Sequence, residues 1–259
     1  AFSRVSIGAH VVHGRATAGM AEQAQSDDGS ARAFKPIDDE VEEDRWVDGL
    51  LRYPLGGGVV CLSDPRGVLV HGTGSGLWAC GKVLSGYLRA RPHICQGAIC
   101  LELGAGVGAA GLVALSLGAR TVVLTDLERQ MPLLQRNVEE NALCGTGATV
   151  KAFAVDWRCL EQRARLNEWA QRWTLVLGAD IGYDPDLFAP LLETLESQCS
   201  PNTVVYLALA DRCEEEEPSV ADFVAAASVS FDCQEVFEKR LEPHQSMSKI
   251  LLLRKRAML

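Results

Sequence analysis

The chain has 259 residues, of which 47% are hydrophobic and 23% are charged, an ordinary composition for a globular protein with room for one large α/β domain and an N-terminal extension. It contains no apolar run of roughly 18 residues or more, so no segment is expected to span a bilayer. The formal net charge of −9 argues against nucleic-acid binding, because phosphate contacts need Lys and Arg, and favours basic partners such as lysine-rich protein surfaces.

Nine cysteines occur in the chain, and no two are spaced as Cys-x-x-Cys. Several lie in or beside apolar stretches, where a thiol packs as a small hydrophobic group. We therefore expect neither a disulfide framework nor a metal site. Free thiols are typical of a reducing compartment, so we expect a cytoplasmic protein that is also found in the nucleus.

Residues 1–45 show no sustained hydrophobic period and are rich in Ala, Gly, Ser and, later, acidic residues. This composition predicts a disordered or weakly ordered extension. Within it, residues 1–21 contain Arg4 and Arg15 but no acidic residue, a bias that transit peptides share. Residues 46–259 are expected to form one folded domain.

A hairpin and a helix are predicted over residues 58–90. Gly58–Ser63 and Val68–His71 are both apolar, and Asp64-Pro65-Arg66-Gly67 between them has the residue order of a type I turn. Two strands across such a turn predict a hairpin. After a glycine-rich connector, apolar residues at helical spacing predict a helix over residues 77–89.

From residue 98 onward, strands and helices alternate. Such alternation predicts a parallel sheet with helices on both faces, here a Rossmann-like core over residues 98–255. Its ligand should lie beyond the carboxyl ends of the strands, where the strand order reverses. The predicted strands are 99–103, 121–125, 149–155, 175–179, 203–210, 231–237 and 250–253, and the predicted helices are 109–117, 131–141, 187–195 and 218–227.

A glycine-rich loop follows the first of these strands, and two cofactors could explain it. Gly106-x-Gly108-x-x-Gly111 matches a dinucleotide fingerprint, and Asp126 follows at the distance of about 20 residues where a ribose-binding acid belongs. An NAD-binding protein is therefore one interpretation.

The other interpretation is the methyltransferase loop E-x-G-x-G-x-G, formed here by Glu102, Gly104, Gly106 and Gly108. Glycine lets the backbone approach a ligand closely. Glu102 could meet the charged amino acid part of S-adenosylmethionine through water or backbone, whereas it would repel a pyrophosphate. We favour this second interpretation.

Acidic and aromatic side chains also follow the next three strands. Asp126 can accept both ribose hydroxyl protons, with a helix N-cap as the alternative. Asp156 can accept a hydrogen bond from the exocyclic amine of adenine, and Trp157 can pack near the adenine ring. The alternative is that Asp156 is an ordinary loop residue and Trp157 is a core residue. Asp180 and Tyr183 would lie at the open edge of the same pocket, unless Asp180 only caps a helix and Tyr183 only packs.

Taken together, these motifs resemble methyltransferase family 16, which includes the lysine methyltransferases of Hsp70 chaperones, of valosin-containing protein and of calmodulin. The resemblance covers about residues 55–255. The D-x-x-Y motif, Asp180 and Tyr183, is its most specific element, although Gly182 stands where an apolar residue is expected. The motifs are Thr73-Gly74 with Trp78, Leu101–Gly106, Thr125-Asp126, Asp156-Trp157 and Ala179–Tyr183.

The resemblance implies a class I methyltransferase: a seven-stranded, mostly parallel sheet with one antiparallel strand, using S-adenosylmethionine. It implies a monomer that methylates a lysine of another protein, such as a chaperone, an ATPase or a translation factor. Arginine or histidine methylation, or cofactor binding without catalysis, are the alternatives. The implied catalytic residues are Asp180 and Tyr183, and the implied cofactor-binding residues are Trp78, Glu102, Gly104, Ala105, Gly106, Asp126, Asp156, Trp157 and Ala179.

An acidic run, Glu214–Glu217, follows a predicted strand near the same sheet edge. It is either a solvated loop or a surface that recruits a basic patch of the substrate.

Overall fold

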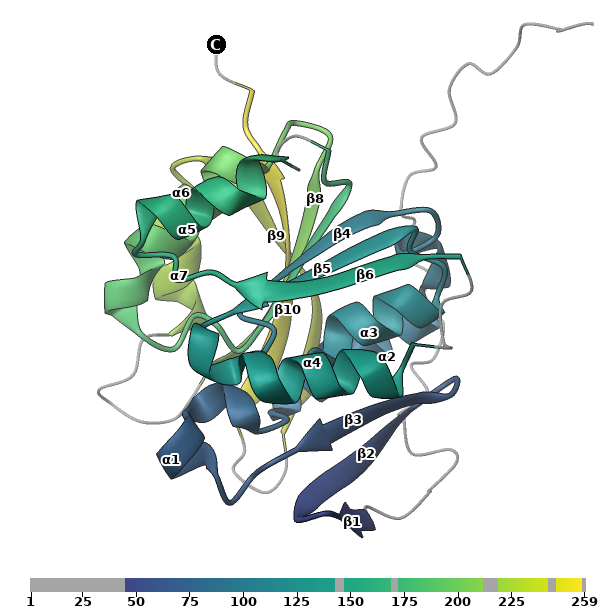
Figure 1. Ribbon diagram of the computed structural model, residues 1–259. Coiled ribbons are helices and arrows are strands. Elements are labelled where there is room, and N and C mark those ends of the chain that lie inside the picture. Colours follow the sequence, from purple (N-terminus) through teal and green to yellow (C-terminus); the bar gives the residue numbers. More distant parts are fainter. Residues whose placement is uncertain (1–44, 143–146, 169–171, 212–218, 242–245, 258–259) are drawn as a thin grey trace, which may run out of the picture. The chain divides into compact units, whose positions relative to one another are not determined.

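The computed structural model describes residues 45–142, 147–168, 172–211, 219–241 and 246–257 (Figure 1). By its internal contacts the chain divides into residues 1–33 and 34–259, and every described residue belongs to the second unit. The extension predicted over residues 1–45 lies outside the described residues except for its last residue, and so does the acidic run Glu214–Glu217.

The core of the described unit is a seven-stranded sheet in the order β6-β5-β4-β7-β8-β10-β9. Strands β6 to β8 pair in parallel, whereas β10 is antiparallel to both β8 and β9. The predicted fold class, a mostly parallel sheet with one antiparallel strand, is therefore confirmed. The strands are β4 (Ile99–Leu103), β5 (Thr121–Asp126), β6 (Thr149–Ala154), β7 (Leu175–Ala179), β8 (Val204–Asp211), β9 (Phe231–Arg240) and β10 (Met247–Lys255).

Helices cover both faces of this sheet, as the alternation of elements predicts (Figure 1). One face carries α2 (Ala79–Ala90), α3 (Ala109–Ser116) and α4 (Met131–Glu140), and the other carries α5 (Leu160–Ala164), α6 (Phe188–Gln198) and α7 (Val220–Ala227). Each face has its own apolar cluster, and Leu84, Leu112 and Leu134 belong to the first. Leu191 and Phe223 belong to the second. None of the helices in the described segments has the length and apolar character that crossing a bilayer requires.

A smaller antiparallel sheet precedes the core, and here the predicted hairpin is wrong. Its strands are β1 (Arg45–Val47), β2 (Leu50–Gly56) and β3 (Val59–Ser63), in the order β1-β2-β3. Strand β3 is present as predicted, but its partner is β2 and not residues 68–71. The sequence pattern does not predict β2, because Pro54 lies inside it and proline is unusual inside a strand. Among the residues that the structure describes, the pairing of β1 with β2 runs from Leu50 to Arg52 and does not reach Pro54, which has no N–H to donate.

Val68–His71 forms the short helix α1 instead of a strand. The type I turn itself is present, because Gly67 N–H donates to the carbonyl oxygen of Asp64 at 3.1 Å. A type I turn has near-helical backbone angles, and Gly67 continues them with φ −83° and ψ −2°. The N–H of His71 then donates to the carbonyl oxygen of Gly67 at 2.6 Å, so the chain winds on rather than reversing. A short apolar run does not distinguish the two outcomes.

The remaining predicted helices and strands are present, with ends shifted by a few residues at most. Short 3-10 helices complete the described chain, and two of them flank the site: η2 (Thr73–Ser75) before α2 and η6 (Pro185–Leu187) before α6. The others are η3 (Pro92–Ile94), η4 (Glu128–Gln130) and η5 (Arg165–Glu168).

Candidate active site

A cavity of about 910 Å³ lies where the carboxyl ends of β4 to β7 meet the segment before α2. Strand β4 has β5 on one side and β7 on the other, so the strand order reverses here. Parallel α/β sheets bind ligands at such a point, and the volume falls in the range of roughly 300–1,000 Å³ typical of small-molecule sites. All the site residues expected from the sequence line this cavity: Trp78, Glu102, Gly104, Ala105, Gly106, Asp126, Asp156, Trp157, Ala179, Asp180 and Tyr183.

The glycine loop between β4 and α3 requires glycine at three positions, and Gly108 is one of them, because its φ is +83° and a Cβ there would lie 2.8 Å from Cδ1 of Leu134. Gly104 has φ +60° and Gly106 has φ +54°, in the left-handed region that other residues rarely adopt. A Cβ on Gly106 would lie 3.0 Å from the carbonyl oxygen of Gly74, and one on Gly104 would lie 2.6 Å from Cγ2 of Ile181. The backbone of the loop therefore borders the cavity with no side chain at either Gly104 or Gly106.

Asp126 holds this loop from the end of β5. Its Oδ2 accepts a hydrogen bond from the N–H of Gly106 at 2.6 Å, and its Oδ1 accepts one from the N–H of Leu127 at 2.7 Å. Burial raises the pKa of Asp126, and these two N–H groups lower it. A carboxylate offers about four acceptor positions, so the remaining ones can serve ribose hydroxyls. That role stays a prediction.

Glu102 stabilises the start of α3 as well as lining the cavity. It is buried, and its Oε2 accepts the N–H of Gly111 at 2.8 Å. Burial raises its pKa to about 8, and the charge of Asp126 also raises it, while the N–H groups of Gly111 and Ala110 lower it. The carboxylate expected to face the cofactor thus already binds a helix N-terminus through one oxygen. This structural role was not predicted from the sequence.

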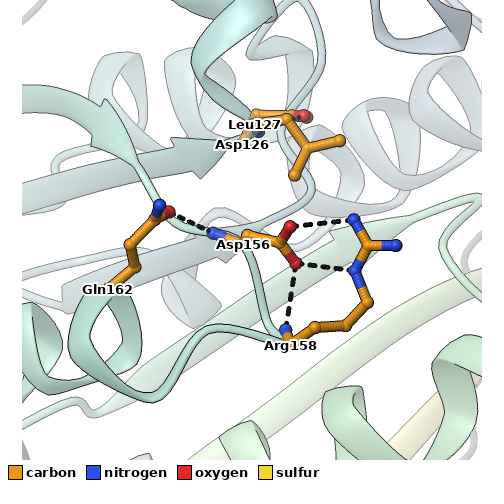
Figure 2. A network of polar contacts seen from close by, with 5 residues as sticks. All are labelled: Asp126, Leu127, Asp156, Arg158 and Gln162. Atoms are coloured by element: carbon orange, nitrogen blue, oxygen red, sulfur yellow. Dashed lines mark hydrogen bonds and ion pairs between the residues drawn. The ribbon is translucent and has the colours of Figure 1, made fainter.

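Asp156 is bound by Arg158 of its own loop, as Figure 2 shows. Nε of Arg158 donates to Oδ1 at 3.0 Å, Nη2 donates to Oδ2 at 2.8 Å, and the backbone N–H of Arg158 donates to Oδ1 at 3.0 Å. The Arg158 guanidinium lowers the pKa of Asp156, so the carboxylate is ionised at neutral pH. The N–H of Asp156 donates to Gln162 Oε1 at 2.8 Å, which fixes the backbone as well. Arg158 also lines the cavity and was not predicted.

Two tryptophans line the cavity, and their indole N–H groups differ in hydrogen bonding. The Nε1 of Trp78 donates to the carbonyl oxygen of Thr73 at 2.7 Å, and 44% of the residue is exposed. The Nε1 of Trp157 is buried and has no hydrogen-bond partner among the described residues. A buried N–H without a partner is costly, so this donor can serve a bound ligand.

Asp180 follows β7 with a left-handed backbone, φ +58°, at a residue that is not glycine. Its N–H donates to the carbonyl oxygen of Ala208 at 2.8 Å, which extends the pairing of Ala179 with β8. The helix-cap alternative for Asp180 is not what the structure shows. The cap of η6 is Asp184, whose Oδ1 accepts the N–H of Asp186 at 3.0 Å.

The glycine between Asp180 and Tyr183 is explained by its neighbours. A Cβ on Gly182 would lie 3.2 Å from both methyl carbons of Leu209 and 3.6 Å from the ring of Phe223. These two side chains fill the space that a bulkier residue would need. Tyr183 follows at the cavity rim, with 40% of the residue exposed.

Further lining residues were missed by the sequence reasoning. Arg129, Gln130 and Asp184 contribute to the cavity in addition to Arg158. Gln130 is buried, and its Nε2 donates to the carbonyl oxygen of His71 at 2.8 Å. Their positions just after strand ends are a signal that could have found them, but the direction of each side chain is not readable from the sequence. No metal-binding group of three or more His, Cys, Asp or Glu occurs within the described ranges.

Comparison with known proteins shows which protein family the chain matches. Residues 67–224 match the family model described as "Lysine methyltransferase". The chain is 35% identical over 166 residues to protein N-lysine methyltransferase METTL21A of Danio rerio, an alignment that covers 64% of this chain and 72% of that protein. It is 33% identical over 143 residues to EEF1A lysine methyltransferase 3 of Xenopus tropicalis, covering 55% and 60%.

The solved structures support the fold only. The crystal structure of the Pyrococcus horikoshii protein PH0793 superposes with a TM-score of 0.52 and 14% sequence identity, over 81% of this chain and 74% of that one.

Proposed function

The chain belongs to the lysine methyltransferase family, and on that basis we propose that its cavity transfers a methyl group from S-adenosylmethionine to the ε-amine of a lysine in another protein. The observation that supports this most is the convergence of the motifs. The glycine loop, Asp126, Asp156 and Asp180 come from four strand ends, and all line one cavity.

The residues present fit the cofactor. The glycine loop offers bare backbone, Asp126 keeps acceptor positions, and the buried Nε1 of Trp157 lacks a partner among the described residues. We propose that these groups, with Trp78 and the ionised Asp156, hold S-adenosylmethionine. When bound, it supplies a methyl group on a positively charged sulfur.

Asp180 is proposed to capture and aim the amine. A lysine has to be neutral to act as a nucleophile, and at pH 7 only on the order of one in a thousand is neutral. A carboxylate favours the ammonium form, so Asp180 is not a simple base. It instead binds and orients the side chain at the cavity edge, next to Tyr183, and the proton leaves to solvent. Orientation alone can lower a barrier by roughly 7–11 kcal/mol.

The partner is proposed to be a folded protein with an exposed lysine. The two relatives described above are named as protein methyltransferases, one of them for EEF1A. The net charge of −9 favours a basic surface. We also propose a monomer in the cytoplasm and nucleus, where thiols such as the buried Cys61, Cys80 and Cys100 stay reduced. Gel filtration and cell fractionation test these two points.

Two assays test the proposed function. Calorimetry should show micromolar binding of S-adenosylhomocysteine and none of NAD, and tighter binding of NAD would overturn the cofactor assignment. Incubation of the chain with labelled S-adenosylmethionine and a cell lysate should then label lysine in a discrete protein. Label on arginine or histidine would correct the substrate residue. Cofactor binding with no labelled protein would indicate a binding module without catalysis.

A further inference from the structure

Two buried asparagines, Asn137 in α4 and Asn141 at the C-cap of α4, attach the N-terminal sheet to the core. Oδ1 of Asn137 accepts the N–H of Leu62 at 2.7 Å, and its Nδ2 donates to the Leu62 carbonyl oxygen at 2.9 Å. Asn141 does the same with Val60, at 2.9 Å and 2.7 Å. Both asparagines have 0% exposure. Each amide therefore pairs with β3 much as a neighbouring strand would.

The two asparagines differ in their other contacts. Nδ2 of Asn141 also donates to the backbone carbonyl oxygen of Asn137 at 2.7 Å. Nδ2 of Asn137 also donates to Cys61 Sγ at 3.8 Å and to the carbonyl oxygen of Val107 at 2.9 Å, and Val107 lies in the glycine loop. The thiol of Cys61 donates to the same oxygen at 3.3 Å. The adjacent residue, Gly106, is the one whose N–H is held by Asp126. Two consecutive loop residues are thus held from different elements: Gly106 by Asp126 at the end of β5, and Val107 by Asn137 of α4.

We propose that Asn137 is a positioning residue for the cofactor site, acting through Val107 on the glycine loop. It ties the loop to β3, so that the N-terminal sheet and the cofactor site are energetically coupled. Truncating Asn137 leaves three buried backbone groups without this partner: the N–H and carbonyl of Leu62 and the carbonyl of Val107. The loss at Val107 bears on the cofactor. This inference rests on the proposed function, because it concerns the same cavity.

The matched pair Asn137→Ala and Asn141→Ala separates positioning from stability. Both variants lose two hydrogen bonds to β3, so both should have a lower melting temperature. Only Asn137→Ala should bind S-adenosylhomocysteine more weakly, on the order of tenfold, by calorimetry at a temperature where circular dichroism shows both variants folded. Equal losses in the two variants, or unchanged affinity in Asn137→Ala, would overturn the proposal. No binding by the unmodified chain would overturn the proposed function and this inference with it.

Hydrogen exchange of the unmodified chain tests the same coupling if Asn137→Ala does not fold. Coupling between two sites is reciprocal, so a ligand on the loop must also stabilise the Asn137 contacts. S-adenosylhomocysteine should slow exchange of the Leu62 N–H, which donates to Asn137, more than that of the Val60 N–H, which donates to Asn141. Equal slowing of the two amides would contradict the proposal.

Discussion

Replacing Glu102 with Gln should stabilise the protein, and the gain should grow with pH. Glu102 is 2% exposed, and its Oε2 accepts the N–H of Gly111 at 2.8 Å. A glutamine can keep this bond through its carbonyl oxygen while removing the charge. Burial raises the pKa of Glu102 to about 8, so the carboxylate form is unfavourable in the folded protein.

The sign follows from the two pKa values. In the unfolded chain the carboxyl has its ordinary pKa of 4.5, whereas in the folded chain it keeps its proton up to about pH 8. Between these values the folded state binds more protons than the unfolded state. The stabilising contribution is therefore complete below the unfolded pKa and is lost as pH rises toward the folded pKa, by about 1.4 kcal/mol per pH unit. From about pH 5 to about pH 7.5 the loss is about 3 kcal/mol.

Urea unfolding of both proteins over this pH range measures the effect. The other titrating groups are shared, so the difference between the two free energies of unfolding reports Glu102 together with its interaction with Asp126. The advantage of Glu102→Gln should increase steadily toward pH 8. A difference that does not change with pH would refute the reasoning that Glu102 is protonated in the folded protein.

Three further predictions concern the cavity. Asp126→Ala should weaken S-adenosylhomocysteine binding at least several-fold, from a loss of roughly 1–3 kcal/mol, and unchanged affinity in a folded variant would remove Asp126 from the site. Asp180→Ala should bind S-adenosylhomocysteine nearly as well as the unmodified chain but methylate about a hundredfold more slowly. Asp180→Asn tests whether the negative charge matters, because asparagine tolerates the left-handed backbone. Full turnover in both Asp180 variants would refute the role assigned to Asp180. Gly104→Ala should lower stability and cofactor affinity, because its Cβ would meet Ile181. Gly58→Ala is its control, with φ +80° and no atom within 4 Å, and equal affinity in the two variants would contradict a role for the loop.

The sheet could be predicted from the sequence because its strands are buried on both faces. Leu175–Ala179 carries no polar side chain, Ile99–Leu103 is apolar except for Glu102, and each run is followed by a helix that must return over the sheet. The N-terminal sheet lacks this signal. Its strand β2 contains Arg52 and Pro54, and most of its residues are only partly buried, so no apolar period marks it.

The site was predictable as a set of strand ends, because parallel strands bring their carboxyl ends to one edge. What the sequence could not provide is which partner each side chain takes. Nothing in the order of residues shows that Arg158 folds back onto Asp156, or that Asn137 reaches the glycine loop. These contacts depend on side-chain directions that only the packed structure defines.

Asp180 shows how such packing bears on function. A left-handed backbone at a residue other than glycine is strained, and it persists only where the surroundings hold it. Here the N–H of Asp180 donates to the carbonyl oxygen of Ala208 at 2.8 Å, which fixes this residue against β8. A glycine at position 180 would relieve the strain at no steric cost. The chain instead has a carboxylate there, bordering the cavity, and the Asp180→Ala and Asp180→Asn variants test whether the proposed capture of the substrate amine is its role.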